Sequence, residues 1–82
     1  MNLDKAALAR LRKHTIERIQ RKYPEGCRVE LVCMDDPQAP PVGTKGTVIR
    51  VDDIGTIHVK WDNGSGLGVA FGVDMCKRVD DK

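Results

Sequence analysis

The sequence predicts a small, mainly β domain preceded by one N-terminal helix, and three observations support this fold class. The first is a period-two alternation that places Ile57, Val59 and Trp61 on one side of the chain, as expected of a strand with one buried face. The second is Asn63-Gly64, a strong hairpin signal that predicts a type I′ turn with positive φ at both residues. The third is an N-terminal segment rich in Ala, Leu, Arg and Lys, which are strong helix formers.

That N-terminal segment is predicted to be a helix over residues 4–23. Asp4 suits the N-cap position, and Pro24 ends the helix because the residue before a proline is pushed out of the α region. At about 100° per residue, one narrow apolar sector results. It contains Leu8, Leu11, Thr15 and Ile19, with Ile16 at its margin. The helix needs a surface to cover this sector, and the β domain and a second copy of the chain are the alternatives.

Five short strands are predicted after the helix. They cover residues 27–34, 47–51, 56–61, 67–71 and 75–79. A four-residue loop from Asp52 to Gly55 joins the second strand to the third, and a loop with three prolines follows the first. Strand parity places Cys33 on the inward face. Five short strands joined by tight turns indicate a five-stranded SH3-like barrel at residues 24–82, preceded by an amphipathic helix at residues 1–23.

Length and cysteine content limit the class of protein. Eighty-two residues form one small domain. No apolar run approaches the roughly 18–20 residues that span a bilayer, so no membrane association is expected. The three cysteines include no CxxC pair, which argues against a disulfide framework and favours a cytoplasmic location.

The distribution of charge indicates either attraction between the two parts of the chain or a separate anionic partner. Residues 1–22 carry seven Lys or Arg against two acidic residues, hence +5, whereas residues 23–82 carry seven against ten, hence −3. The candidate binding residues on the helix are Arg10, Lys13, Arg18 and Arg21. The expected partner is nucleic acid or an acidic protein surface. The alternative interpretation is a solvated helix face without a partner.

No catalytic, metal or cofactor site is predicted. The acidic pairs at residues 35–36 and 52–53 fall at turns, where Asp is favoured because it bonds the local backbone. A zinc site would have to use Cys27, Cys33, Cys76, His14 and His58. These residues lack the paired spacing of zinc ligands. The chain is therefore expected to be non-enzymatic.

Four stretches carry a resemblance to a known family. They are residues 34–37, 41–48, 51–65 and 72–74. The chain resembles, over about residues 24–79, the bacterial and phage domain-of-unknown-function family four-three-one-four. The resemblance implies an SH3-like barrel, no known activity and an association with phage or mobile elements.

The function expected from the sequence is that of a small binding module. It would engage nucleic acid or nucleoprotein through the basic helix. The alternative is a protein–protein adaptor or an inhibitor of a host or defence protein, which the phage association of the family makes reasonable. In that case Leu8, Leu11 and Ile19 could also pair two copies of the chain as a homodimer.

Overall fold

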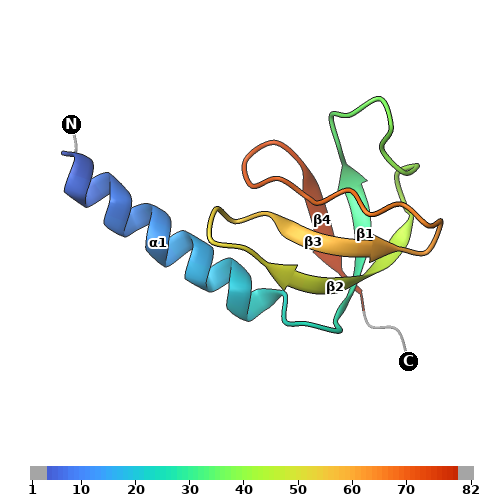
Figure 1. The fold of residues 1–82 in the computed structure, drawn as a ribbon, viewed down its shortest axis with the longest axis horizontal. Coiled ribbons are helices and arrows are strands. Elements are labelled where there is room, and N and C mark those ends of the chain that lie inside the picture. The colour runs from blue at the N-terminus through green and yellow to red at the C-terminus, as the bar shows by residue number, and fades with distance from the viewer. Residues whose placement is uncertain (1–3, 80–82) are drawn as a thin grey trace.

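The computed structural model describes residues 4–79, which form one helix and one four-stranded antiparallel sheet (Figure 1). The elements are α1 (Lys5–Lys22), β1 (Arg28–Cys33), β2 (Lys45–Val51), β3 (Ile57–Trp61) and β4 (Met75–Arg78). The strand order is β3-β2-β1-β4, so β3 and β4 are the edges of an open sheet. The predicted helical and barrel segments also included residues 1–3 and 80–82, which lie outside the described residues.

The helix has the predicted bounds and caps. The Asp4 carboxylate accepts a hydrogen bond from the backbone N–H of Ala7 at 2.6 Å, so Asp4 is the N-cap. At the other end the N–H of Tyr23 donates to the Ile19 carbonyl, and Pro24 follows. Figure 1 shows α1 projecting away from the sheet, so that its C-terminal half lies nearest to the strands.

The predicted fifth strand does not form, and the count of five strands is wrong for residues 4–79. Within this range, residues 67–71 contribute one isolated bridge, between Val69 and Ile57. Two side chains form hydrogen bonds with the backbone carbonyl and N–H of Leu67, which a β-strand would use to pair with its neighbour. The Leu67 carbonyl accepts a 2.7 Å hydrogen bond from the Trp61 indole, and the Leu67 N–H donates to the Ser65 hydroxyl. The predicted closure into a barrel is accordingly replaced by an open sheet.

The Asn63-Gly64 turn is not of type I′. Gly64 has a φ of 93°, but no described residue other than glycine has positive φ, so Asn63 does not meet the type I′ requirement. The Gly64 N–H donates to the Trp61 carbonyl, and the Trp61 N–H donates to the Ser65 carbonyl, both at 3.0 Å. This pattern is a three-residue hairpin loop with a bulge, which needs positive φ only at its last residue.

The turn between β2 and β3 has the same pattern. The Gly55 N–H donates to the Asp52 carbonyl, and the Asp52 N–H donates to the Thr56 carbonyl. Gly55 has a φ of 89°. The loop therefore contains three residues and a bulge, where the sequence predicted four.

A register shift corrects the prediction for Cys33. The β1–β4 pairing is regular to Leu31 and shifts before Cys33, so the strict alternation breaks there. Cys33 is consequently exposed, whereas Val29 and Leu31 are buried. The inward orientation predicted for Cys33 is wrong.

The core lies between the inner face of the sheet and the C-terminal end of α1. Its buried members are Tyr23, Val29, Leu31, Val48, Ile57, Val59, Trp61, Val69 and Cys76. The Tyr23 hydroxyl reaches the Cys76 carbonyl at 3.3 Å, which ties the end of α1 to the edge strand β4. The predicted placement of Trp61 in the core is confirmed. Among residues 4–79 no helix is long and apolar enough to cross a membrane.

Candidate functional site

The face that α1 presents to the sheet differs from its predicted apolar sector. Ile16 is the buried residue of the helix, and the Gln20 side-chain amide donates to the Val51 carbonyl at 3.4 Å. Leu8 and Leu11 remain 49% and 54% exposed, because they lie on the projecting half of α1. Of the predicted sector, Ile19 packs against the core. The sheet therefore covers a neighbouring face of the helix.

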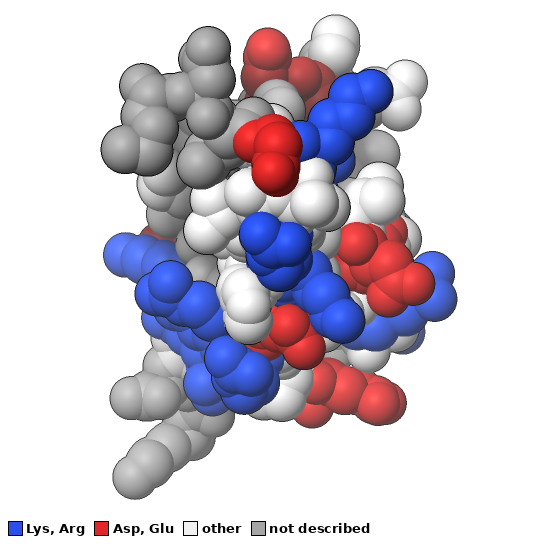
Figure 2. Space-filling model, turned by 90° about the vertical axis from the view of Figure 1, so that its left-hand side faces the viewer, with Lys and Arg blue, Asp and Glu red and all other residues white. Residues whose placement is uncertain are grey.

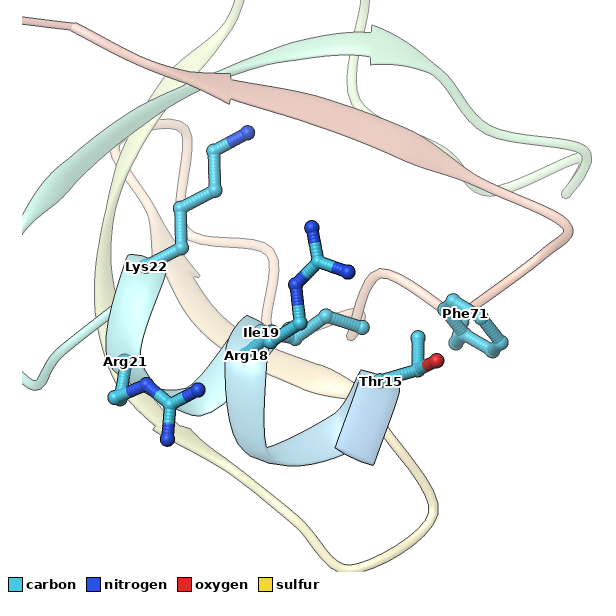
Figure 3. Close-up of a pocket in the computed structure, with 6 residues that line it drawn as sticks. All are labelled: Thr15, Arg18, Ile19, Arg21, Lys22 and Phe71. Carbon is cyan, nitrogen blue, oxygen red and sulfur yellow. The ribbon is translucent and has the colours of Figure 1, made fainter. Parts of the chain in front are cut away.

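A hollow of about 630 Å³ opens beside the docked half of α1 (Figure 3). Its lining residues are Thr15, Arg18, Ile19, Arg21, Lys22 and Phe71. Five of them belong to the last two turns of α1, and Phe71 belongs to the turn that leads into β4. In Figure 3 the Arg18 and Lys22 side chains extend to the same side of α1, and Arg21 extends the other way.

The turn that carries Phe71 is closed by hydrogen bonds to both its ends. The N–H groups of Val73 and Asp74 donate to the Ala70 carbonyl at 3.1 and 2.9 Å. The Asp74 carboxylate accepts from the Ala70 N–H at 2.9 Å and from the Asp35 N–H at 3.1 Å. Phe71 is thus held on a well-bonded turn although half of its surface is exposed.

The four predicted binding residues do not converge on one place. Arg18 and Arg21 line the hollow, whereas Lys13 lines a separate hollow of about 470 Å³ next to Glu17 and Asp53, and Arg10 lines neither. Lys13 and Arg18 are five residues apart and so differ by about 140° around the axis. Arg10 lies on nearly the same side of α1 as Arg21 but about three turns earlier, beyond the part of the helix that lines the hollow. The structure brings only half of the predicted set together.

The sequence analysis missed two residues of this site. Lys22 follows Arg18 by four positions and therefore lies on the same side of α1, a signal that the sequence does contain. Phe71 was assigned to the end of a strand. No local pattern relates it to a helix about 50 residues earlier, so its place beside Thr15 is visible only in the fold.

The hollow is electrostatically positive. None of its lining residues is Asp or Glu, and within residues 4–79 neither Arg18 nor Arg21 forms an ion pair. The Glu17 carboxylate, which follows Lys13 and precedes Arg21 by four positions, lies 4.0 Å from His14 Nδ1. The Lys22 ammonium lies over the Tyr23 ring, 5.5 Å from its centre.

Charge is mixed elsewhere on this end of the molecule. Figure 2 views the end from which α1 projects and shows Lys and Arg side chains gathered together, with Asp and Glu side chains between and beside them. Acidic neighbours of this kind weaken the field of a single cation. No Asp or Glu lines the hollow itself, whereas Asp74 lines an adjoining hollow of about 210 Å³ that shares Lys22 and Phe71 with it.

Within the acidic pair at residues 52–53, Asp52 has the local turn role that the sequence predicted. The Asp52 carboxylate accepts from the backbone N–H groups of Ile54 and Thr56 and bonds His58 Nε2 at 2.9 Å. The pKa of Asp52 is lowered, first by the hydrogen bond with His58 and then by the bond from Thr56. These contacts hold the hairpin loop together.

The three cysteines are free thiols that differ in burial: Cys33 is exposed, Cys27 is partly buried and Cys76 is buried. Burial raises the pKa of the Cys76 thiol to about 11, and burial also raises the pKa of Cys27. A thiol with a raised pKa is mostly protonated near neutral pH, and the protonated form is the unreactive one. Within residues 4–79, no group of three His, Cys, Asp or Glu side chains comes together as a metal site would require.

Comparison with known proteins identifies the family. Residues 12–79 match the family described as "Domain of unknown function (DUF4314)", which covers most of the 82-residue chain and confirms the resemblance predicted from the sequence. The match begins at residue 12, so it includes the docked half of α1 and every residue that lines the hollow. Searches of curated proteins and of solved structures gave no significant match.

Proposed function

We propose that this chain, which belongs to the DUF4314 family, is a non-enzymatic module that binds nucleic acid or nucleoprotein through the docked half of α1. One observation carries the proposal: Arg18, Arg21 and Lys22 line a single hollow that no carboxylate lines. Phosphate groups are the natural ligands of such cations, because arginine bonds a phosphate through two parallel N–H groups and lysine supplies a compact charge.

The position of these cations strengthens the proposal. A concave surface lined by one sign of charge focuses its field on a ligand. The hollow has a volume within the range of about 300–1,000 Å³ that is typical of ligand pockets. The cations also lie on a helix whose last turns pack on the core, so their backbone is fixed before a ligand arrives.

The fold proposed for this module is an SH3-like one. In Figure 1, β2 and β3 run across the picture while β1 and β4 stand upright, so the sheet is strongly twisted. The Val69 bridge lies beside β3, where a fifth strand would continue the sheet towards closure. A cytoplasmic location and a phage association remain part of the proposal, on the grounds of the unpaired cysteines and the family resemblance.

The test is a comparison of two double charge reversals that change the net charge equally. Arg18→Glu with Arg21→Glu removes cations of the hollow, and Arg10→Glu with Lys13→Glu removes predicted cations outside it. Binding of labelled oligonucleotides is followed by fluorescence anisotropy over a range of salt concentrations. Three phosphate contacts predict a log–log salt slope of about −2.7 on duplex DNA and about −2.1 on a single strand.

The proposal expects the first variant to lose binding and the second to keep most of it. Both variants should melt near the wild-type temperature, because all four side chains are exposed. Equal losses in the two variants would assign binding to general positive charge. An absence of binding by the wild-type protein at low salt would refute the proposed function.

A protein partner is the second candidate, and the exposure of Leu8 and Leu11 favours it. These leucines project beyond the sheet with the basic residues Arg10 and Arg12 beside them in the sequence. An adaptor or inhibitor could use them against an acidic, partly apolar protein surface, or two copies could pair through them. Leu8→Ser with Leu11→Ser should then abolish capture of the partner, or dissociate a dimer in sedimentation, without affecting oligonucleotide binding.

A further inference from the structure

We infer that the ligand of the hollow is a single-stranded nucleic acid, with one base stacked on the Phe71 ring and the adjacent phosphates bound by Arg18 and Lys22. This inference rests on the proposed function and specifies the class of nucleic acid. It follows from the combination of an exposed aromatic ring and cations in one concave site. That combination is how single strands are bound without sequence preference.

Phe71 is the aromatic side chain that the chain leaves accessible. Tyr23 and Trp61 are buried in the core, whereas Phe71 is 50% exposed. An isolated exposed apolar residue is common on proteins. Phe71 differs because its ring borders a cavity that is otherwise lined largely by cations, and a nucleobase presents a planar apolar face joined to an anionic backbone.

The backbone that carries Phe71 is positioned before any ligand binds. Its turn is fixed by the hydrogen bonds to the Ala70 carbonyl and by the Asp74 carboxylate. Its first side-chain carbon also lies against Gly55, since a Cβ added at Gly55 would be 3.1 Å from the Cβ of Phe71. A ring carried on a fixed turn loses less conformational entropy on stacking than a ring on a mobile loop.

The shape of the site favours a single strand over a duplex. Bases in a duplex are stacked on one another and cannot reach a ring at the border of a hollow, whereas unpaired bases turn outwards freely. A duplex would instead need a broad row of cations along α1. Such a row is interrupted by acidic side chains, because Glu17 and Asp53 line the same hollow as Lys13.

The experiment compares a short labelled oligothymidylate, the matched thymidine–adenine duplex and a polyglutamate peptide. Phe71→Ala should weaken binding of the single strand roughly 5- to 150-fold, the equivalent of one stacked base. Phe71→Trp should bind the single strand as the wild type does. The fluorescence of the new exposed indole should be quenched on binding, and Trp61 should not contribute to this change because it is buried. The control is Val73→Ala, which truncates an exposed residue of the same turn that does not line the hollow.

Each result has a definite meaning. A preference for the single strand that Phe71→Ala removes and Phe71→Trp restores supports the inference. Salt-sensitive binding of the duplex at least as tight as that of the single strand, unchanged in Phe71→Ala, would overturn the inference and leave the proposed function standing. Binding of polyglutamate with no binding of either nucleic acid would overturn both.

Discussion

Gly46→Ala tests how the core is built, because this glycine has no room for a side chain. Gly46 lies in β2, between β1 on one side and β3 on the other. A Cβ at this position would lie 2.6 Å from Val59 Cγ1, 2.9 Å from the Lys60 carbonyl oxygen and 2.9 Å from Trp61 Cε3. Ordinary contacts between such atoms are about 3.5–4.0 Å. The indole of Trp61 packs where a side chain of residue 46 would otherwise be.

The cost of this substitution follows from the rigidity of the neighbours. Val59 and Trp61 are fully buried, and the third contact is a backbone atom, so none of the three moves easily. Overpacking of this kind costs about 1–3 kcal/mol. A chain of 82 residues has a total stability of roughly 4–12 kcal/mol at about 0.05–0.15 kcal/mol per residue. A loss of about 2 kcal/mol should lower Tm by roughly 8–16 °C.

Urea denaturation followed by the fluorescence of Trp61 measures the effect. Gly66→Ala is the matched control, since a Cβ there meets nothing within 4 Å and the residue has no positive φ. Gly64→Val supplies the contrasting case of open space with a φ of 93°, where backbone strain alone costs about 1–3 kcal/mol. The packing argument is refuted if Gly46→Ala and Gly66→Ala unfold at the same urea concentration.

Two further predictions concern the helix and the first hairpin loop. Ile16→Ala should lower the free energy of unfolding, measured by urea denaturation, by about 2–5 kcal/mol because Ile16 is only 7% exposed. Leu11→Ala, at a residue that is 54% exposed, should lower it by less than about 1 kcal/mol. A larger loss for Leu11→Ala than for Ile16→Ala would mean that the sheet covers the predicted apolar sector. Because the pKa of Asp52 is lowered in the folded state, the unfolded chain binds this proton more readily. The stabilisation that the ionised Asp52 carboxylate provides is therefore present above the ordinary pKa of Asp and lost as pH falls below about 4. Asp52→Asn should flatten the acid limb of a plot of unfolding free energy against pH, and parallel plots for the two proteins would contradict this assignment.

The features predicted correctly from the sequence are those with local causes. The bounds of α1 follow from Asp4 and Pro24, each of which acts on backbone within one turn of itself. The burial of Ile57, Val59 and Trp61 follows from alternation within one uninterrupted strand. In each case the determining contacts lie within a few residues of one another, so a linear pattern contains the necessary information.

The incorrect predictions depend on contacts between distant segments. Strand parity predicted Cys33 to face inwards, but pairing with β4 inserts a register shift that no pattern within β1 reveals. Residues 67–71 have the composition of a strand. They do not form a strand because the Leu67 carbonyl accepts a hydrogen bond from the indole of Trp61. This contact exists only once β3 and the following turn have formed.

The same reasoning explains why only two of the four predicted binding residues line the hollow. The charge pattern identified Arg18 and Arg21, but it gave equal weight to Arg10 and Lys13. The helix sequence alone does not indicate which of its faces, or which of its halves, packs against the sheet. Docking through Ile16 and Gln20 decides which cations border a concave surface and which project into water. It also brings Phe71 to the helix and so determines the chemistry of the hollow.

The docking of α1 further implies that its two halves can act independently. The half from Thr15 onwards is fixed to the core and contains the lining residues of the hollow. The half before residue 12 lies outside the family match, projects from the sheet and exposes Leu8 and Leu11. Leu8 lies about two turns before Thr15, whereas Leu11 lies about one turn before it and accepts a 2.9 Å hydrogen bond from the Thr15 hydroxyl through its backbone carbonyl. Because this contact uses only the backbone of Leu11, substitutions of the Leu8 or Leu11 side chains should leave the hollow unchanged. A ligand of the hollow and a protein partner of the projecting half could therefore be bound at the same time, and each surface can be removed by mutation without loss of the other.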